Sequence, residues 1–166
     1  MTATPTPEFA VLFRDFMAER IRDEHACTAR VFAALHDGDW RPDPKSRSAR
    51  ELAWHIASSE RWFVSSAASR KFEGGQDGPL PATLAEIISY YDSAWEGDLA
   101  RLSALTGEQL LEVTDFFGMK VPLYTLLNFA QIHTIHHRAQ LSTYLRPLGG
   151  KVPDIYGGSA DNPWQG

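Results

Sequence analysis

Four segments of the sequence repeat apolar side chains at intervals of three or four residues, which is the period of an amphipathic α-helix. They run over about 8–35, 48–72, 84–105 and 122–146, and most of the proline and glycine lies between or after them. The third segment is the most regular. Its apolar positions are Leu84, Ile87, Ile88, Tyr91, Trp95, Leu99, Leu102 and Leu105. No segment alternates apolar and polar residues as a strand would, so the sequence predicts an all-α fold, a four-helix bundle.

Start signals agree with these limits. Ser46 or Ser48 can cap the second helix and Thr83 the third, because a hydroxyl group there accepts a hydrogen bond from an amide of the first turn. Pro122 suits the first turn of the last helix. Residues 106–120, TGEQLLEVTDFFGMK, are expected to form an irregular crossing that can include a short extended piece.

The length and composition fit one folded domain. With 166 residues, the chain is close to the common size of a domain with one hydrophobic core. We expect a single domain over 1–166, with the helical core at about 8–147 and an irregular tail, KVPDIYGGSADNPWQG, across the bundle. Hydrophobic residues make up 43% and charged residues 22% of the chain, which excludes disordered, collagen-like and membrane classes.

Charge, cysteine content and the first residues limit the partners and the location of the protein. The formal net charge is -5 and there is no block of lysine or arginine, which disfavours nucleic-acid binding. The single cysteine, Cys27, cannot form an internal disulfide or a cysteine-rich zinc site. No apolar run reaches the roughly 18 residues of a spanning helix, and the first residues lack the features of a signal peptide. We therefore expect a cytoplasmic protein that acts on a small molecule, without nucleic-acid or membrane partners.

Histidine spacing on the last predicted helix places two imidazoles on one face. Residues four apart differ by about 40° around a helix, so His133 and His137 point the same way, and His137 lies within the apolar arc that faces the core. His136 points about 100° away from His137 and is not assigned as a ligand. On the second predicted helix, His55 flanks the inward apolar stripe. Three imidazoles are therefore predicted to converge inside the bundle.

Buried imidazoles are costly unless their nitrogens find partners, and one divalent cation satisfies three of them at once. Three protein ligands leave a coordination position open, which is the pattern of catalytic rather than structural zinc sites. A set of histidines alone suits Zn, Ni, Co and Fe alike, so the sequence predicts one divalent metal per chain without naming it. The alternative is that each histidine is a hydrogen-bonded core residue, and helix geometry alone does not decide between the two.

Further residues are candidates for supporting the metal ligands or lining a pocket, and no residue is assigned a catalytic role. These candidates are Glu24, His25, Ser59, Trp62, Gln140 and Tyr144. Glu24 could orient a ligand or act as a base, or it could be solvated or salt-bridged. His25 lies near the apolar stripe of the first helix and is expected to be structural or to support a ligand.

Two stretches of the sequence resemble a known family. IHTIHHRAQLSTYLRPLGGKVPDIYG, preceded upstream by SARELAWHIASSERWF, is similar to the signature of the DinB-like (YfiT-like) metal-binding four-helix proteins. The resemblance includes a histidine in an L-x-W-H-I phrase, an H-x-x-H-H-R-x-Q-L run and a G-x-x-V-P tail. In that family one histidine of the second helix and the first and last histidines of the fourth-helix motif bind the metal. They correspond to His55, His133 and His137, in agreement with the helical wheel.

The resemblance also implies an up-down-down-up helix order, a homodimer and a reaction class. Relatives are thiol-dependent transferases or isomerases that use bacillithiol, mycothiol or glutathione, which would make a low-molecular-weight thiol the co-substrate. Exposed aromatic residues such as Trp40 or Trp164 would be covered in a homodimer.

The leading hypothesis is thus a metal-dependent thiol S-transferase. The alternatives are a metal-dependent hydrolase that uses the same site and a non-catalytic metal-binding stress protein whose metal stabilises the fold. A ferritin-like di-iron bundle is disfavoured because no glutamate stands three residues before a histidine.

Overall fold

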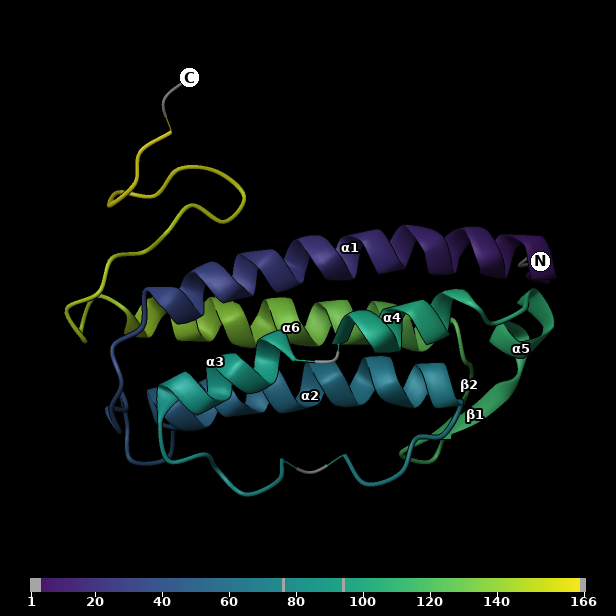
Figure 1. The fold of residues 1–166 in the computed structure, drawn as a ribbon, viewed down its shortest axis with the longest axis horizontal. Helices are drawn as coiled ribbons and strands as arrows, with labels where there is room; N and C mark the ends of the chain where they lie inside the picture. Colours follow the sequence, from purple (N-terminus) through teal and green to yellow (C-terminus); the bar gives the residue numbers. More distant parts are fainter. Residues whose placement is uncertain (1–3, 76, 94, 165–166) are drawn as a thin grey trace.

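The protein is a bundle of helices with one small hairpin at its end (Figure 1). The computed structural model describes residues 4–75, 77–93 and 95–164. In chain order the elements are α1 (Pro7–Ala33), α2 (Ala49–Ser69), α3 (Leu84–Asp92), α4 (Trp95–Ser103), α5 (Gly107–Leu111), β1 (Val113–Phe116), β2 (Met119–Pro122) and α6 (Thr125–Tyr144). The all-α bundle predicted from the helical period is confirmed.

Figure 1 shows the order in which the helices run. Helices α1 and α6 run in one direction, while α2 and the α3–α4 pair run in the other. The chain returns outside the bundle after α2, through residues 70–75 and 77–83, so that α3 starts at the same end as α2. This is the up-down-down-up order that the family resemblance implies.

Local hydrogen bonds explain where two of the helices begin. The Ser48 hydroxyl accepts a hydrogen bond from the Glu51 amide at 3.2 Å, and the Glu51 carboxylate accepts one from the Ser48 amide at 2.6 Å. Thr83 and Glu86 form the same reciprocal pair at the start of α3. Each pair satisfies two amides that have no partner within the helix. The structure therefore confirms Thr83 and chooses Ser48 over Ser46 as the cap of α2.

The prediction of one continuous helix over 84–105 is wrong, because the structure has two helices there, α3 and α4. Ser93 has an extended backbone, with φ -85° and ψ 138°, and its hydroxyl and amide both donate to the Tyr90 carbonyl. Such local bonds compete with the helical pattern. The apolar period continues past the break because both short helices bury one face. Their buried apolar residues are Leu84, Ile87, Tyr91, Leu99 and Leu102.

The crossing before the last helix is more regular than predicted. It contains α5 and an antiparallel hairpin in which Phe116 pairs with Met119. The two turn residues, Phe117 and Gly118, have φ values of 51° and 84°, as a tight hairpin turn requires. Pro122 pairs with Val113 at the end of this hairpin, so α6 begins at Thr125 and not at the proline.

Two large apolar clusters fill the bundle, one toward each end. One includes Val31, Phe32, Ile56, Ile87 and Leu141, and the other Met17, Ile21, Val64, Leu99 and Leu127. A smaller cluster of Phe63, Phe116, Leu126 and Ala130 packs α2 and α6 against the hairpin. A layer of buried polar side chains, here called the polar belt, lies between the two large clusters along α1, α2 and α6. It consists of Glu24, His25, Thr28, Glu60, Thr134 and Arg138.

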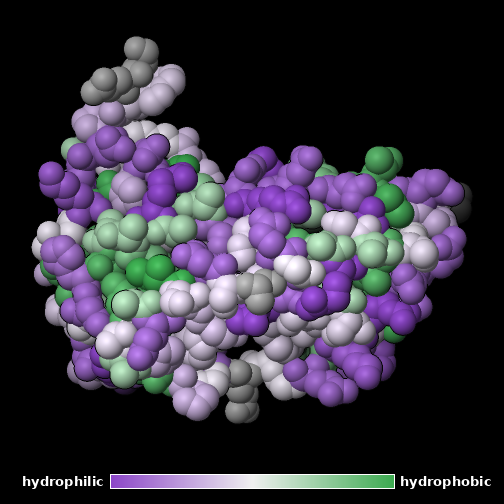
Figure 2. All heavy atoms as spheres, in the orientation of Figure 1, coloured by the Kyte–Doolittle hydropathy of each residue, from purple (hydrophilic) through white to green (hydrophobic). Residues whose placement is uncertain are grey.

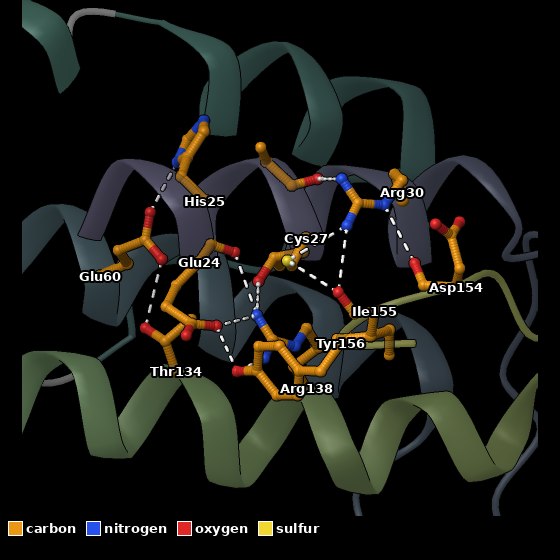
Figure 3. Close-up of polar contacts among 12 residues, drawn as sticks. Glu24, His25, Cys27, Arg30, Glu60, Thr134, Arg138, Asp154, Ile155 and Tyr156 are labelled. Atoms are coloured by element: carbon orange, nitrogen blue, oxygen red, sulfur yellow. Dashed lines mark hydrogen bonds and ion pairs between the residues drawn. The ribbon is translucent and has the colours of Figure 1, made fainter. Parts of the chain in front are cut away.

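The polar belt contains a buried ion pair between α1 and α6 (Figure 3). Arg138 is 1% exposed and lies 2.6 Å from a carboxylate oxygen of Glu24. The Arg138 guanidinium also donates to the backbone carbonyl of Glu24 at 3.1 Å. Tyr156, from the C-terminal tail, hydrogen-bonds to both side chains. The tail thus contacts α1 as expected, although the residues after Tyr156 extend away from the bundle (Figure 1).

The surface is mainly hydrophilic on the face shown in Figure 2, where strongly hydrophobic residues form smaller patches. Within the described residues, each helix falls short of the length or the apolar character needed to cross a bilayer.

We predict that Arg138→Met lowers the free energy of unfolding by about 3–5 kcal/mol, because it leaves the buried Glu24 carboxylate without its cation. The matched control is Arg146→Met, which removes an arginine whose side chain is 55% exposed and whose partner is Asp161. This control should cost about 1 kcal/mol or less. Urea unfolding of both variants measures the difference. Equal, small losses would show that the ion pair does not hold α1 and α6 together.

Candidate metal centre

Three histidines of two neighbouring helices meet near the middle of the bundle. His55 comes from α2, and His133 and His137 come from successive turns of α6. Their ring centroids are 4.4–4.9 Å apart, and one nitrogen from each lies within 4.8 Å of the others. The Nε2 atoms of His55 and His137 are 3.2 Å apart. The structure therefore brings together the three predicted ligands, here called the histidine triad, in a group that could hold a metal ion.

Asp77 orients the imidazole of His55. It lies on the segment that returns outside the bundle, and one of its carboxylate oxygens is 2.8 Å from His55 Nδ1. The Ser58 hydroxyl donates to the same carboxylate at 2.6 Å, and Arg47 lies 3.7 Å away. Burial raises the pKa of Asp77, but the hydrogen bonds from Ser58 and His55 outweigh it and lower this pKa below its usual value. The charged carboxylate accepts the proton of Nδ1, which leaves Nε2 of His55 free to face the triad.

The other two imidazoles are oriented in the same way by side chains of the bundle helices α2 and α6. His137 Nδ1 lies 2.8 Å from Oε1 of Gln140, one turn further along α6. His133 Nδ1 lies 3.3 Å from the Ser59 hydroxyl of α2. Because Ser59 donates its own proton to a backbone carbonyl, it can accept the Nδ1 proton of His133. All three rings are therefore held through Nδ1 with Nε2 available, which is the usual arrangement around a bound metal.

The environment favours the uncharged forms of His133 and His137. Burial, together with the neighbouring His137 and His55, lowers the pKa of His133 to about 4. Burial also lowers the pKa of His137, although the hydrogen bond with Gln140 opposes this. Neutral imidazole is the form that binds a metal ion. At neutral pH the two rings are in that form without having to lose a proton.

An apolar cavity of about 180 Å³ adjoins the triad on the side of the β1–β2 hairpin. His55 and His133 form one wall of it. The remaining wall is largely aromatic, with Trp62 and Phe63 from α2 and Phe116 and Phe117 from the hairpin. We call this space the aromatic cavity.

A wider groove of about 610 Å³ adjoins the triad on its other side, at His137. Its lining combines the polar side chains of Arg47, His136, Gln140 and Thr143 with apolar side chains such as Leu52 and Ile135. We call this space the polar groove, after the polar side chains that distinguish it from the aromatic cavity. The triad therefore lies between two spaces of different size and different lining residues.

Four of the six candidate supporting residues lie where a role at the triad requires. They are Ser59, Trp62, Gln140 and Tyr144, the last as part of the lining of the polar groove. The other two belong to the polar belt. Glu24 is salt-bridged to Arg138, which was the alternative to a role as a base or in orienting a ligand. His25 is structural, since its Nδ1 lies 2.6 Å from Glu60 (Figure 3). Its ring also stacks between those of Tyr91 and Trp95.

Sequence reasoning missed Asp77 and the hairpin phenylalanines. Asp77 stands in the glycine-rich stretch EGGQDGPLP, where no spacing to a histidine marks it, and it reaches His55 because the return segment passes α2. Phe116 and Phe117 lie in the crossing predicted as irregular. A contact between a loop and a helix of this kind leaves no signal in a single sequence.

Comparison with known sequences agrees with this architecture. The DinB family model matches residues 12–164. The Bacillus subtilis protein YrdA is 30% identical over 137 residues, which cover 81% of this chain and 82% of YrdA. YjoA of the same organism is 32% identical over 116 residues, which cover 66% of this chain and 73% of YjoA.

Solved structures show the same fold. A DinB-like protein from Bacillus cereus superposes with a TM-score of 0.71 at 27% identity, over 84% of this chain and 95% of the other. The DinB-like protein YjoA from Bacillus subtilis gives a TM-score of 0.66 at 27% identity, over 84% of this chain and 96% of the other. The sequence match along most of the chain and the shared fold show that the chain belongs to the DinB family.

Proposed function

We propose that this protein is a metal-dependent enzyme that transfers a low-molecular-weight thiol to a small electrophile. The histidine triad would hold one divalent ion through its three Nε2 atoms, and the chemistry of neutral imidazoles suits Zn, Ni, Co or Fe. The Nδ1 contacts with Asp77, Ser59 and Gln140 support this, because they hold the rings in place before any ion arrives. A divalent ion there would lower the pKa of a thiol or a water molecule at the remaining coordination position.

The charge of the site favours an anion beside the triad. The three imidazoles are neutral ligands, and Asp77 supplies one negative charge behind His55. Arg47, 3.7 Å from Asp77, partly balances this charge. A divalent cation would therefore be incompletely neutralised by the protein. Both a thiolate and a hydroxide meet this need, so charge alone does not separate a transferase from a hydrolase.

The two spaces beside the triad are the observation that favours transfer. A hydrolase needs a space for one substrate and a water molecule, whereas transfer of a thiol needs spaces for two organic molecules. The polar groove, with Arg47 and Gln140, suits a polar thiol, and the aromatic cavity suits a smaller apolar partner. In the transfer the sulfur lone pair forms the new bond to carbon, and the leaving group takes the electron pair of the bond that breaks.

Metal binding can be tested separately from catalysis. Wild-type protein should bind about one divalent ion per chain, and replacing any triad histidine by alanine should remove it, because two imidazoles hold such an ion poorly. His136→Ala is the matched control, since His136 neighbours His137 but does not belong to the group that could hold the ion. Elemental analysis after dialysis gives the stoichiometry. Loss of metal in His136→Ala with retention in His133→Ala would contradict the assignment of ligands.

Thiol transfer can be tested with the metal-loaded protein and two electrophiles, iodoacetamide and benzyl chloride. We expect bacillithiol, mycothiol or glutathione to form thiol adducts faster than in the uncatalysed reaction, and this acceleration to be lost in His137→Ala and kept in Arg146→Ala. Arg47→Ala should raise the KM for the thiol while Arg146→Ala does not, because Arg47 lines the groove. Metal-dependent turnover of the electrophile without thiol would favour the hydrolase. No turnover and no thermal shift with any thiol would favour the non-catalytic metal-binding protein.

We also propose that two copies of the chain associate through α1. Trp40 was expected to be covered by a partner chain, but it packs against Tyr144 of its own chain. Trp164 is 81% exposed, and three apolar residues form an exposed stripe on α1. They are Phe9, Leu12 and Phe16, which are 47%, 69% and 57% exposed. Strongly hydrophobic atoms are visible near the start of α1 in Figure 2, and patches of this kind commonly mark interfaces.

A homodimer through α1 predicts a dimer mass for the wild-type protein in light scattering at micromolar concentration. Leu12→Glu should give a monomer without loss of helicity, because the side chain contributes to the exposed stripe and not to the core. Val113→Glu, at an apolar residue of β1 that is 65% exposed, is the control and should leave the mass unchanged. A wild-type monomer would rule out the homodimer.

A further inference from the structure

We propose that the aromatic cavity binds a single neutral aromatic ring, and that Phe117 of the hairpin turn is its main specificity residue. The inference rests on the proposed function in one respect, namely that this ring belongs to the electrophile that accepts the thiol. The existence of the cavity and the identity of its walls follow from the geometry and do not depend on the proposed function.

The aromatic walls of the cavity come from two separate elements, α2 and the β1–β2 hairpin. The ring centroid of Trp62 lies 4.9 Å from that of Phe63, its neighbour on α2, and 6.1 Å from that of Phe117. The interplanar angle between Trp62 and Phe117 is 39°, so these rings are tilted and do not stack against each other. Trp62 is held by its indole N–H, which donates to the Glu73 carbonyl at 2.9 Å. Its polar atom is thereby used, and its ring faces the cavity as an apolar surface.

The requirements of folding do not explain why a phenylalanine stands at position 117. Its backbone has φ 51°, a left-handed conformation that is unfavourable for a bulky residue, and its side chain is 70% exposed. Asparagine or glycine would fit the turn with less strain and expose no ring. A residue that is costly in both respects, and that lines a cavity beside the triad, points to a ligand that contacts it.

Gly75, which also lines the cavity, supports the same interpretation. It has φ 82°, and a Cβ atom there would lie 3.0 Å from Phe117 Cζ and 3.2 Å from Trp62 Cζ2. The absence of a side chain lets the return segment approach both rings closely. The close approach helps to hold Phe117 over the cavity.

The size of the cavity limits the ligand to one ring. An engineered cavity of about 150 Å³ with apolar walls binds benzene, so about 180 Å³ accepts one ring with a short substituent. A fused two-ring system would be too large unless part of it remained in solvent.

The polar groups of the lining select against a charged ring. The Ser58 hydroxyl donates to Asp77, and the Ser59 hydroxyl donates to a backbone carbonyl, so both are already engaged. No lysine or arginine is among the described residues that line the cavity, and Asp77 is negatively charged. In the protein without metal, a carboxylate on the ring would therefore lose its hydration without gaining a cation. The reactive substituent of a neutral ring can point toward the triad, where the Nε2 atoms lie.

The experiment measures binding by ligand-observed NMR titration, with benzyl alcohol on the metal-loaded protein and with both benzyl alcohol and benzoate on protein freed of metal by a chelator. Without the metal, benzyl alcohol should bind at least about tenfold more tightly than benzoate, because no cation is then available to the carboxylate. Phe117→Asn should weaken binding of benzyl alcohol about three- to tenfold, which is the effect expected for loss of one ring contact. Met119→Asn is the matched control, because Met119 belongs to the same hairpin and is 46% exposed but does not line the cavity. It should leave binding unchanged.

Two further readouts separate a role in recognition from a role in folding. Phe117→Asn should not lower the free energy of unfolding, because asparagine tolerates the left-handed conformation. In the transfer assay the same variant should raise the KM for benzyl chloride and leave that for iodoacetamide unchanged. A variant that loses stability together with binding would show that Phe117 acts in folding, and would overturn its assignment.

Failure of this inference differs from failure of the proposed function. Benzyl alcohol should still bind to protein from which the metal has been removed by a chelator, since the ring contacts need no ion. Thiol transfer to iodoacetamide without binding of benzyl alcohol would overturn the aromatic site and leave the proposed function intact. Phe117-dependent binding in a protein that never transfers thiol would confirm the aromatic site and overturn the proposed function.

Discussion

The buried ion pair between Arg138 and Glu24 is the interaction on which the rest of the structure depends. It lies in the polar belt between two apolar clusters, where apolar packing alone would tolerate small rotations of the helices. Arg138 directly follows His137, so the ion pair that turns Arg138 toward α1 also fixes the rotation of α6. With that rotation set, His137 and His133 face α2 and His55. The orientation of the triad is therefore a consequence of how α6 is held through a neighbouring face, about 100° from His137.

The residues that orient the triad come both from helices and from loops. Ser59 and Gln140 lie on the same two helices as the rings they orient, so their positions follow from the bundle. Asp77 comes from the return segment, which also carries Gly75 to the aromatic cavity. The hairpin adds Phe116 and Phe117. A rigid set of ligands is thus combined with walls from irregular segments, the parts of a fold in which sequence can change most freely.

Much of the fold and the triad could be predicted because both depend on short-range periodicity. The shared direction of His133 and His137 requires only that their segment be helical. Ser48 is one of the two serines that the sequence predicts as the cap of the second helix. The break at Ser93 was missed because the apolar period runs through it and the competing hydrogen bonds leave no mark on that period. Asp77 and Phe117 were missed because their roles arise from long-range contacts of loops, which no local pattern encodes.

The central claim is that three imidazoles hold a divalent ion and leave a position that a thiol can occupy. X-ray absorption spectroscopy of the zinc-loaded protein tests it most directly, before and after addition of the thiol. The account predicts three imidazole nitrogens at about 2.0–2.1 Å, and one sulfur at about 2.3 Å that appears only with the thiol. A fourth protein ligand that the thiol does not displace, or fewer than three imidazoles, would contradict it.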